Sequence, residues 1–408
     1  MRYLARVALF VGLVGLAHAA AADEATLIGK HVVGYQGWFG CPGDDGSNRW
    51  IHWFRGQEST KATDLHVDLW PDVSELSFDE RCRTGLQLPN GEPADVFSSA
   101  NPKTVRRHFR WMKEYGIDGA VLVRFAVELT TPERAIRPDV VLGHVRSAAE
   151  AEGRGFMVMY DLTGMPDGRI VQTIKDDWLR LGYTAKITES PSYMRHRRKP
   201  VVGLWGVGFT HVRLTPAEAS ALIDFFEGQD VTLMGGVPTY WRTLQSDSRP
   251  DLDWADIYRR FDILSPWMVG RIRTPADAVL FAQEVIKEDI AATQEAGLDY
   301  MPTVFPGFSW YNLKQGKSPL NSIPRLCGAF YNVQVKSVLA AGAKMLFTAM
   351  FDEVDEGTAI FKIVRRPAEL PMEATLLAPD QSGCDLGSDF YLRLAGDATR
   401  DVRQAASK

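Results

Sequence analysis

Short apolar runs alternate with longer segments of helical periodicity along most of the chain. Runs dense in Val, Leu, Ile, Met and Phe, and bounded by turn residues, are typical of strands that are covered on both faces. We predict eight such strands, at residues 31–39, 119–125, 156–162, 200–205, 231–235, 262–267, 299–305 and 344–351.

Helical segments separate most of these strands. Pro102 and Pro275 are favourable first helical residues, and Thr215 to Glu218 read as a capping box. The helices are expected at residues 102–116, 139–151, 168–181, after 215, after 253, at 275–296 and at 327–341. Strand–helix alternation predicts a parallel sheet, and a count of eight strands favours a closed (β/α)8 TIM barrel.

A doubly wound open sheet is the alternative to the barrel. Its nucleotide-binding form would need a Gly-rich phosphate loop after the first strand, but GYQGWFG lacks the G-x-G-x-x-G spacing and does not open a helix. Residues 60–100 carry little helical periodicity and several turn signals, so we expect a long insertion after the first strand.

The last predicted strand ends in a cluster of acidic residues. In KMLFTAMFDEVDEGT, residues 344–358, the apolar run is followed at once by Asp352, Glu353, Asp355 and Glu356. The strand C-termini are where a parallel barrel builds its active site. Glu353 and Glu356 are three residues apart and would be neighbours in a helical or turn-like segment, so one pKa should rise and the other stay low. The alternative is a solvated acidic turn.

Aromatic and polar residues collect at the other predicted strand ends. Aromatic faces pack on the C–H surface of a sugar, while acids, Gln and Arg hydrogen-bond its hydroxyls. The same aromatics could instead be rim packing, and Arg124 could be the structural partner of an acid. The candidate substrate-binding residues are Tyr35, Gln36, Trp38, Arg124, Asp161, Trp205, Trp267, Trp310 and Asp355, beside the candidate catalytic pair Glu353 and Glu356.

Composition indicates an exported globular protein. The 408 residues are 45% hydrophobic and 24% charged, and the formal net charge of −5 gives no reason to expect nucleic acid or anionic lipid as a partner. Residues 1–22 resemble a signal peptide, with an apolar core too short to span a bilayer, and residues 23–408 are expected to form one barrel domain. No later apolar run reaches about 18 residues, so we expect a periplasmic or secreted protein with no membrane anchor, and a monomer.

Cysteine and histidine usage adds two expectations. The four cysteines permit disulfides in an exported chain, with Cys41–Cys82 the preferred pair and the other connectivities open. No histidines have H-x-H or H-E-x-x-H spacing, so no catalytic transition metal and no cofactor are expected. The oxygen-rich loop at residues 44–48 lacks a twelve-residue calcium loop with its closing Glu, so an ordinary polar loop is preferred to calcium.

Several of these motifs together resemble a known family. DEVDEGTAIFK resembles the N-E-W-H-E-G-T-x-I signature of glycoside hydrolase families 99 and 71, and GYQGWF, CPGDDG, WIHWF, VDLWPDVSE, FMVMYDLTG, GLWGVGF, DILSPWMVGR and VFPGFSWYN look like the bacterial and fungal branch called family 71/99-like. The likeness covers nearly the whole chain after the signal segment and implies a (β/α)8 barrel that acts on carbohydrate.

The resemblance also implies roles for the acids. Glu353 matches the family's base, which deprotonates the sugar's 2-hydroxyl to give a 1,2-anhydro intermediate, and Glu356 matches the acid that protonates the leaving oxygen. Asp352, Val354 and Asp355 depart from the signature's Asn, Trp and His, which puts the family's mannosidase activity in doubt. The expected function is an exported glycosidase. The alternatives are a non-catalytic carbohydrate-binding protein on the same scaffold, and a lyase or metal-dependent enzyme that uses the acids as ligands.

Overall fold

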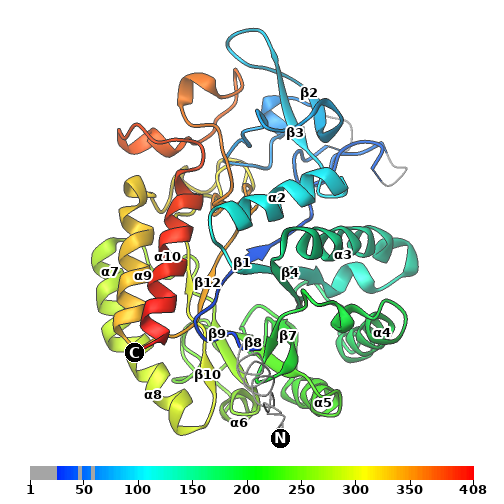
Figure 1. Cartoon of the computed structure of the whole chain (residues 1–408), viewed down its shortest axis with the longest axis vertical. Helices are drawn as coiled ribbons and strands as arrows, with labels where there is room; N and C mark the ends of the chain where they lie inside the picture. The colour runs from blue at the N-terminus through cyan, green and yellow to red at the C-terminus, as the bar shows by residue number, and fades with distance from the viewer. Residues whose placement is uncertain (1–24, 45–47, 57–59) are drawn as a thin grey trace, which may run out of the picture.

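The computed structural model describes residues 25–408 apart from 45–47 and 57–59, so the expected signal peptide lies outside the described residues. Its centre is one curled sheet of parallel strands with helices around it (Figure 1). The central strands are β1 (His31–Tyr35), β4 (Gly119–Phe125), β5 (Gly155–Asp161), β7 (Lys199–Trp205), β8 (Thr232–Val237), β9 (Ile263–Pro266), β10 (Asp299–Tyr300), β11 (Thr303–Val304) and β12 (Leu346–Thr348).

The barrel closes through one strand that is interrupted in its middle. The sheet order is β10-β9-β8-β7-β5-β4-β1-β12-β11, so β10 and β11 lie at the two ends of the path although only Met301 and Pro302 separate them in sequence. Met301 N–H donates to the Leu264 carbonyl on one side, and Phe347 N–H donates to the Pro302 carbonyl on the other. Pro302 has no N–H of its own, which explains the break. The prediction of a (β/α)8 barrel is confirmed.

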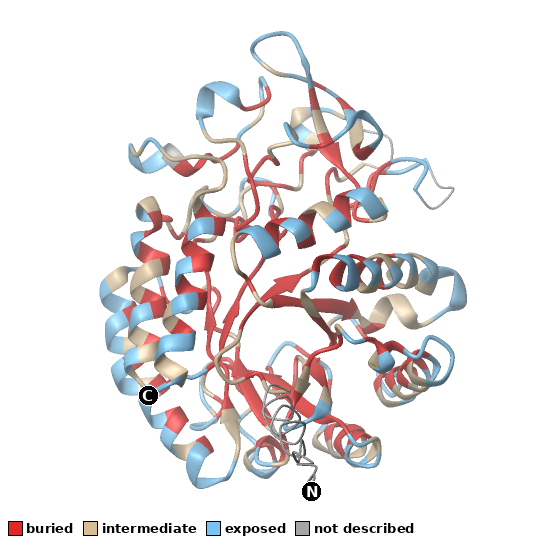
Figure 2. Cartoon of the chain, in the orientation of Figure 1, coloured by how far each residue is buried: buried red, intermediate tan, exposed pale blue. Residues whose placement is uncertain are grey.

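Helices follow the barrel strands as predicted. They are α2 (Pro102–Glu114), α3 (Pro132–Glu152), α4 (Ile170–Tyr183), α5 (Pro216–Glu227), α6 (Asp253–Tyr258), α7 (Pro275–Phe281), α8 (Lys287–Glu295), α9 (Ala329–Ala340) and α10 (Phe390–Ala406). Asn101 caps α2, and Thr215 and Thr274 form capping boxes that begin α5 and α7. The helices bury one face against the strands and expose the other (Figure 2).

The boundaries depart from the predictions at several places. The first strand ends at Tyr35 rather than at residue 39, because the following residues turn toward the acidic segment after β12. α3 begins at Pro132 and continues through Pro138, so it starts earlier than the helix predicted at residues 139–151. The sequence analysis assigned no helix to residues 390–406. There α10 packs on β1, where Nδ1 of His31 lies 2.9 Å from the Thr399 hydroxyl.

The insertion after β1 packs against the loops after β11 and β12, where Asp68 accepts the backbone N–H groups of Tyr311 and Asn312 and donates its own backbone N–H to the Val354 carbonyl. It includes an antiparallel hairpin of β2 (Arg81–Gln87) and β3 (Pro93–Phe97), which projects above α2 in Figure 1. Cys41 is disulfide-bonded to Cys82 at the start of this hairpin, as predicted, and Cys327 is bonded to Cys384. In the part of the chain that the structure describes, no helix is both long and apolar enough to cross a membrane.

Candidate active site

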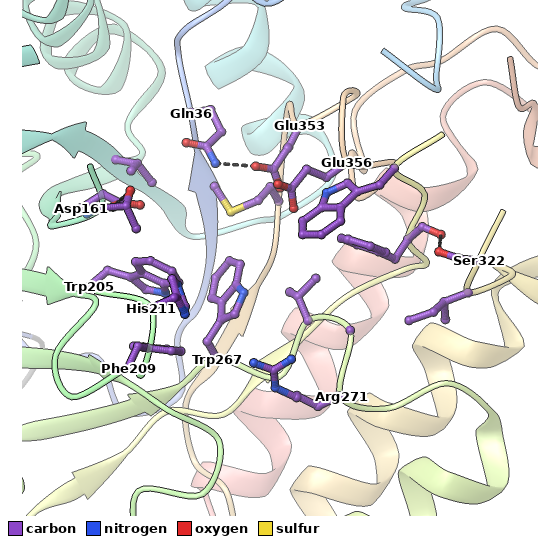
Figure 3. A pocket seen from close by; sticks show the side chains of 18 of the residues that line it. Gln36, Asp161, Trp205, Phe209, His211, Trp267, Arg271, Ser322, Glu353 and Glu356 are labelled. Atoms are coloured by element: carbon purple, nitrogen blue, oxygen red, sulfur yellow. Dashed lines mark hydrogen bonds between the residues drawn. The ribbon is translucent and has the colours of Figure 1, made fainter. Parts of the chain in front are cut away.

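A cavity of about 540 Å³ opens where the barrel strands end, and we call it the main cavity. It is lined by residues of β4, β5 and β7 and by residues from the loops after β1, β5, β7, β9, β11 and β12. Eight of the candidate residues from the sequence analysis line it: Gln36, Trp38, Asp161, Trp205, Trp267, Trp310, Glu353 and Glu356. Figure 3 shows Glu353 and Glu356 side by side on one wall, with Asp161 and Trp205 on the opposite side. The strand ends and the loops after them therefore converge as the barrel topology requires.

Asp352 fixes the acidic segment to the end of the first strand. Its buried carboxylate accepts the backbone N–H groups of Gln36 at 2.8 Å and Gly37 at 2.9 Å. Burial raises the pKa of Asp352 to about 7, and the two N–H donors oppose that rise. Asp352 itself does not line the main cavity; it sets the position of the residues that do.

A turn after the strand aims the two glutamates into the cavity. Gly357 has φ +67°, and a Cβ atom there would lie 2.9 Å from the backbone nitrogen of Ser309. Ser309 N–H donates to the Glu356 carbonyl at 2.9 Å, which joins the acidic segment to the loop that carries Trp310. Asp68, from the insertion, accepts the backbone N–H groups of Tyr311 and Asn312, both at 2.8 Å, and so holds the same loop.

Glu353 is buried and held by two side-chain donors. Nε2 of Gln36 donates to Oε1 at 2.6 Å, and the Thr358 hydroxyl donates to Oε2 at 2.8 Å. Burial raises the pKa of Glu353, as do the charges of Glu356 and Asp355, whereas the two donors lower it. The net effect is a pKa of Glu353 well above its ordinary value, and the two donors limit that rise.

Glu356 has a different environment at the cavity wall. Burial raises its pKa to about 8, with a further rise from the charges of Asp355 and Asp161, while Trp310 and the positive charge of Lys314 oppose the rise. Glu353 and Glu356 repel each other when both are ionised, which disfavours the doubly ionised pair and favours one that holds a proton. A carboxyl pair in this state can offer one acid and one base at the same place.

Asp161 supplies a third buried carboxyl on the opposite wall (Figure 3). Burial raises its pKa to about 6, although the N–H of Thr163 at 2.8 Å and the hydroxyl of Thr163 at 2.6 Å both donate to its Oδ1. Both Thr163 donors bind Oδ1, and no hydrogen bond to Oδ2 is found among the described residues, so Oδ2 can accept a ligand hydroxyl.

Aromatic rings form much of the remaining surface. Trp205 lies edge to face with Trp267, with ring centroids 5.6 Å apart, and stacks on Phe209 at 4.9 Å. The indole N–H groups of Trp38 and Trp205 are buried and have no hydrogen-bond partner among the described residues. An aromatic wall with unsatisfied N–H donors suits a ligand that has both C–H faces and hydroxyls.

Three of the candidate substrate-binding residues do not line the cavity, which corrects the expectation for them. Tyr35 is buried with its hydroxyl 2.9 Å from Nδ1 of His108. Arg124 is buried and binds Asp177 through Nε at 2.7 Å, which is the structural alternative weighed for it. Asp355 is also buried, with Oδ2 at 3.3 Å from Nδ1 of His52.

The main cavity also contains residues that the sequence analysis did not single out. Phe209, His211, Arg271, Phe308 and Ser322 line it from loops (Figure 3). Phe209 and His211 come shortly after Trp205, which ends β7. Their closeness in sequence to that strand end was the signal that could have identified them as cavity residues. Phe308 and Ser322 belong to the long loop after β11, whose path the sequence does not indicate.

The described residues contain no group of three or more His, Cys, Asp or Glu side chains arranged to hold a metal ion. The candidate calcium loop at 44–48 falls largely outside the described residues. The acidic cluster itself is divided between separate tasks, because Asp352 accepts backbone N–H groups and Asp355 faces His52.

The chain is similar in structure to a glycoside hydrolase family 99 endo-α-mannosidase from Bacteroides thetaiotaomicron. The complex of that protein with bis-tris-propane matches with a TM-score of 0.68 and 17% sequence identity, over 94% of this chain and 99% of the other. A second structure of the mannosidase matches with a TM-score of 0.65 and 16% identity, over 94% of this chain and all of the other. No protein-family model and no curated protein sequence matches the chain. At this identity the similarity shows a shared fold, and the fold that the resemblance implied is confirmed.

Proposed function

We propose that the protein is a glycoside hydrolase that cleaves a poly- or oligosaccharide after export from the cytoplasm. The observation that carries the proposal is the pair Glu353 and Glu356, which share one wall of a cavity whose other surfaces are aromatic rings and Asp161. The two disulfides are consistent with an oxidising compartment.

Glu356 is the proposed acid. Its pKa of about 8 keeps it protonated at neutral pH, and its place on the cavity wall lets it give that proton to the oxygen of the scissile bond. Glu353 is the proposed base, because Gln36 and Thr358 stabilise its carboxylate. Cleavage would then leave the proton count of the pair unchanged, since one carboxyl loses a proton while the other gains one.

The position of both carboxyls on one segment favours a 1,2-anhydro route over a carboxylate nucleophile. In an ordinary retaining enzyme the two carboxyls lie about 5 Å apart on opposite sides of the bond. Here Glu353 would take the proton of the 2-hydroxyl while O2 attacks C1, and Glu356 would protonate the departing oxygen. Water would then attack C1, giving its proton to Glu356, while O2 recovers its proton from Glu353.

The fold neighbour suggests α-linked mannosides as the first substrates to test, but the substrate can differ. Val354 stands where the family signature has Trp; its side chain is buried and does not line the cavity. The sugar platform is instead provided by Trp38, Trp205, Trp267 and Trp310.

The test is hydrolysis of a panel of α- and β-linked glycans by the wild type and by Glu356→Gln. We expect release of product from at least one glycan and a loss of about 100-fold or more in the variant. Glu369→Gln makes the same substitution at an exposed position outside the cavity and should keep full activity. Equal rates for Glu356→Gln and wild type would remove Glu356 from the mechanism. A wild type that binds a glycan and cleaves none would favour the non-catalytic carbohydrate-binding protein.

A further inference from the structure

A second cavity of about 710 Å³ lies beside the main cavity and takes no part in the proposed chemistry. Its walls come from residues 49–55 and His66, in the insertion after β1, from Glu128, after β4, and from residues 133–137, in the first turns of α3. Trp38 lines the main cavity and His52 lines the second, and the two rings stack with centroids 4.0 Å apart and planes 8° apart. One layer of stacked rings therefore separates the two cavities.

The second cavity has an excess of positive groups. Four arginines line it, Arg49, Arg55, Arg134 and Arg137, against two acids, Glu128 and Glu133. Burial raises the pKa of Glu128, while the charges of His52, Arg137 and Arg134 lower it. Glu133 interacts with its own backbone N–H and with Thr131 at the start of α3, which lowers its pKa and ties its charge to the helix end. Arg137 also pairs with Asp44 at 3.5 Å, so the anion-binding role falls to other arginines of the cavity.

Arg55 and Arg134 are the clearest anion donors. The guanidinium of Arg55 donates to the carbonyl oxygens of Asn312 at 2.6 Å and Thr63 at 2.5 Å, both neutral, so its charge is held in place without being neutralised by them. Arg134 is an exposed residue in the first turn of α3. Nearby, Nδ1 of His66 is buried with no partner among the described residues. A fixed guanidinium fork of this kind matches the two oxygens of a carboxylate or sulfate.

The same cavity offers apolar surface of the kind that contacts a sugar ring. Trp50, Ile51, Phe54 and Ile136 line it, and Ile136 is 57% exposed. An aromatic and aliphatic wall beside arginines is suited to a ring with an anionic substituent rather than to a free inorganic anion.

We propose that the second cavity is a subsite for an acidic sugar of the substrate, one that bears a carboxylate or a sulfate group. This inference rests on the proposed function and names its substrate class. Glu353, as the ionised base, and Asp161 would repel an anionic group placed between them, so in this proposal a neutral sugar occupies the reacting centre and the acidic unit occupies the arginine-lined cavity next to it. The glycan is therefore of mixed composition.

The test measures binding apart from cleavage. The Glu356→Gln protein is titrated by calorimetry with uronic-acid-containing oligosaccharides, with their carboxyl-reduced forms, with sulfated oligosaccharides, and with inorganic sulfate. We expect an acidic glycan to bind about tenfold more tightly than its reduced form, with a preference that declines as salt is added. Equal binding of both forms, no binding of any acidic glycan, or equally tight binding of inorganic sulfate would overturn the inference.

Three variants test whether the preference for acidic glycans arises from the second cavity. Arg134→Gln should lose most of it, and Arg55→Lys should lose part, because lysine keeps the charge without the fork. Arg259→Gln removes an equally exposed arginine that pairs with Asp256 on α6, and it should change nothing. A preference that survives in the Arg134→Gln/Arg55→Lys double variant would also overturn the inference.

The two proposals fail in different ways. If the wild type binds acidic glycans selectively but cleaves no glycan, the proposed hydrolase activity is rejected and the proposed acidic subsite stands. If the wild type cleaves only neutral glycans and shows no charge preference in binding, the proposed hydrolase activity stands and the proposed acidic subsite is rejected.

Discussion

Gln36 donates its side-chain N–H to Oε1 of Glu353 across 2.6 Å, which joins the end of the first barrel strand to the segment after the last. The same two segments are joined a second time through Asp352, which accepts the backbone N–H of Gln36. Glu353, near the end of the sequence, is thus positioned by Gln36, near its beginning. The pairing of β1 with β12 in the barrel brings the two residues together.

Gln36→Ala should shift the acidic limb of the pH–rate profile to higher pH. The amide N–H stabilises the Glu353 carboxylate, so its removal raises the pKa of the base, and the base is then ionised only at higher pH. We expect kcat to fall about 10- to 100-fold at neutral pH. Thr358→Val, which removes the other donor, should shift the limb in the same direction.

The control for this experiment is Gln172→Ala, which breaks another Gln-to-carboxylate hydrogen bond of 2.6 Å on the exposed surface of α4. It should leave the profile unchanged. An acidic limb that stays in place in both Gln36→Ala and Thr358→Val would show that Glu353 is not the titrating base.

The sequence predicted the barrel well because its signals are local. Buried strands, Pro at helix starts and capping boxes each depend on a few neighbouring residues, and the acidic cluster follows its strand directly. The direction of individual side chains was less predictable. Tyr35, the last residue of β1, and Arg124, the last but one of β4, face the helix layer. They lie against His108 of α2 and Asp177 of α4. In a strand covered on both faces, apolar residues occupy both sides, so the pattern does not reveal which side faces the centre.

The second cavity and the course of the insertion after β1 could not be predicted either, but for a different reason. They depend on where the insertion returns to the barrel, as Asp68 does when it binds the backbone of Tyr311, 243 residues later. The long-range partners of such segments carry no periodic signal. The exception is the disulfide between Cys41 and Cys82, which sequence context alone suggested.

Lys314→Met should move the alkaline limb of the profile to higher pH. The Lys314 ammonium lies 4.6 Å from the centre of the Trp310 ring, and its charge lowers the pKa of Glu356. Without that charge Glu356 keeps its proton to higher pH, and the proposed acid stays active there. Because Lys314 is exposed, the shift should be a fraction of a pH unit and should shrink in high salt.

Lys317→Met is the matched control, since Lys317 is exposed on the same loop and does not line the main cavity. A limb that moves equally in both variants would point to a general effect of net charge. A limb that moves to lower pH in Lys314→Met would contradict the assignment of Glu356 as the acid.

Trp205→Ala should raise KM by about tenfold or more, with Trp205→Phe closer to wild type. The indole packs between Phe209 and Trp267 at the cavity wall, so its loss removes both a flat contact surface and a buried N–H donor. Steady-state kinetics on the cleaved glycan provide the measurement. Tyr183→Ala removes an aromatic side chain that is 79% exposed outside the cavity, and it should leave KM unchanged.

Loss of the Cys41–Cys82 disulfide should lower stability without direct damage to the acids. The bond closes a segment of 41 residues, for which the chain-entropy relation gives a stabilisation of about 4 kcal/mol. A Cys41→Ala/Cys82→Ala protein should therefore melt at lower temperature than wild type. Exposed Ser382→Ala, beside the second disulfide, is a control that retains both bonds. Equal melting temperatures for the double variant and wild type would show that the insertion is held by its packing alone.

The buried carboxyls also predict how stability depends on pH. The folded-state pKa of Glu356 is raised from 4.5 to about 8, and those of Asp352 and Asp161 are raised from 3.8 to about 7 and about 6. Between the unfolded and folded pKa values the native state binds more protons than the unfolded state, so the free energy of unfolding falls as pH rises. The loss begins near pH 4 and continues to about pH 8.

Melting temperatures measured between pH 4.5 and 8.5 test this relationship. Wild type should melt at lower temperature at the alkaline end, and Glu356→Gln should show a shallower decline because a neutral amide does not lose a proton. Glu92→Gln, at an exposed turn between β2 and β3, makes the same change in composition and should keep the wild-type slope. A slope in Glu356→Gln that equals that of wild type would mean that Glu356 is not protonated in the folded state, and it would then be unable to act as the acid that the proposed reaction requires.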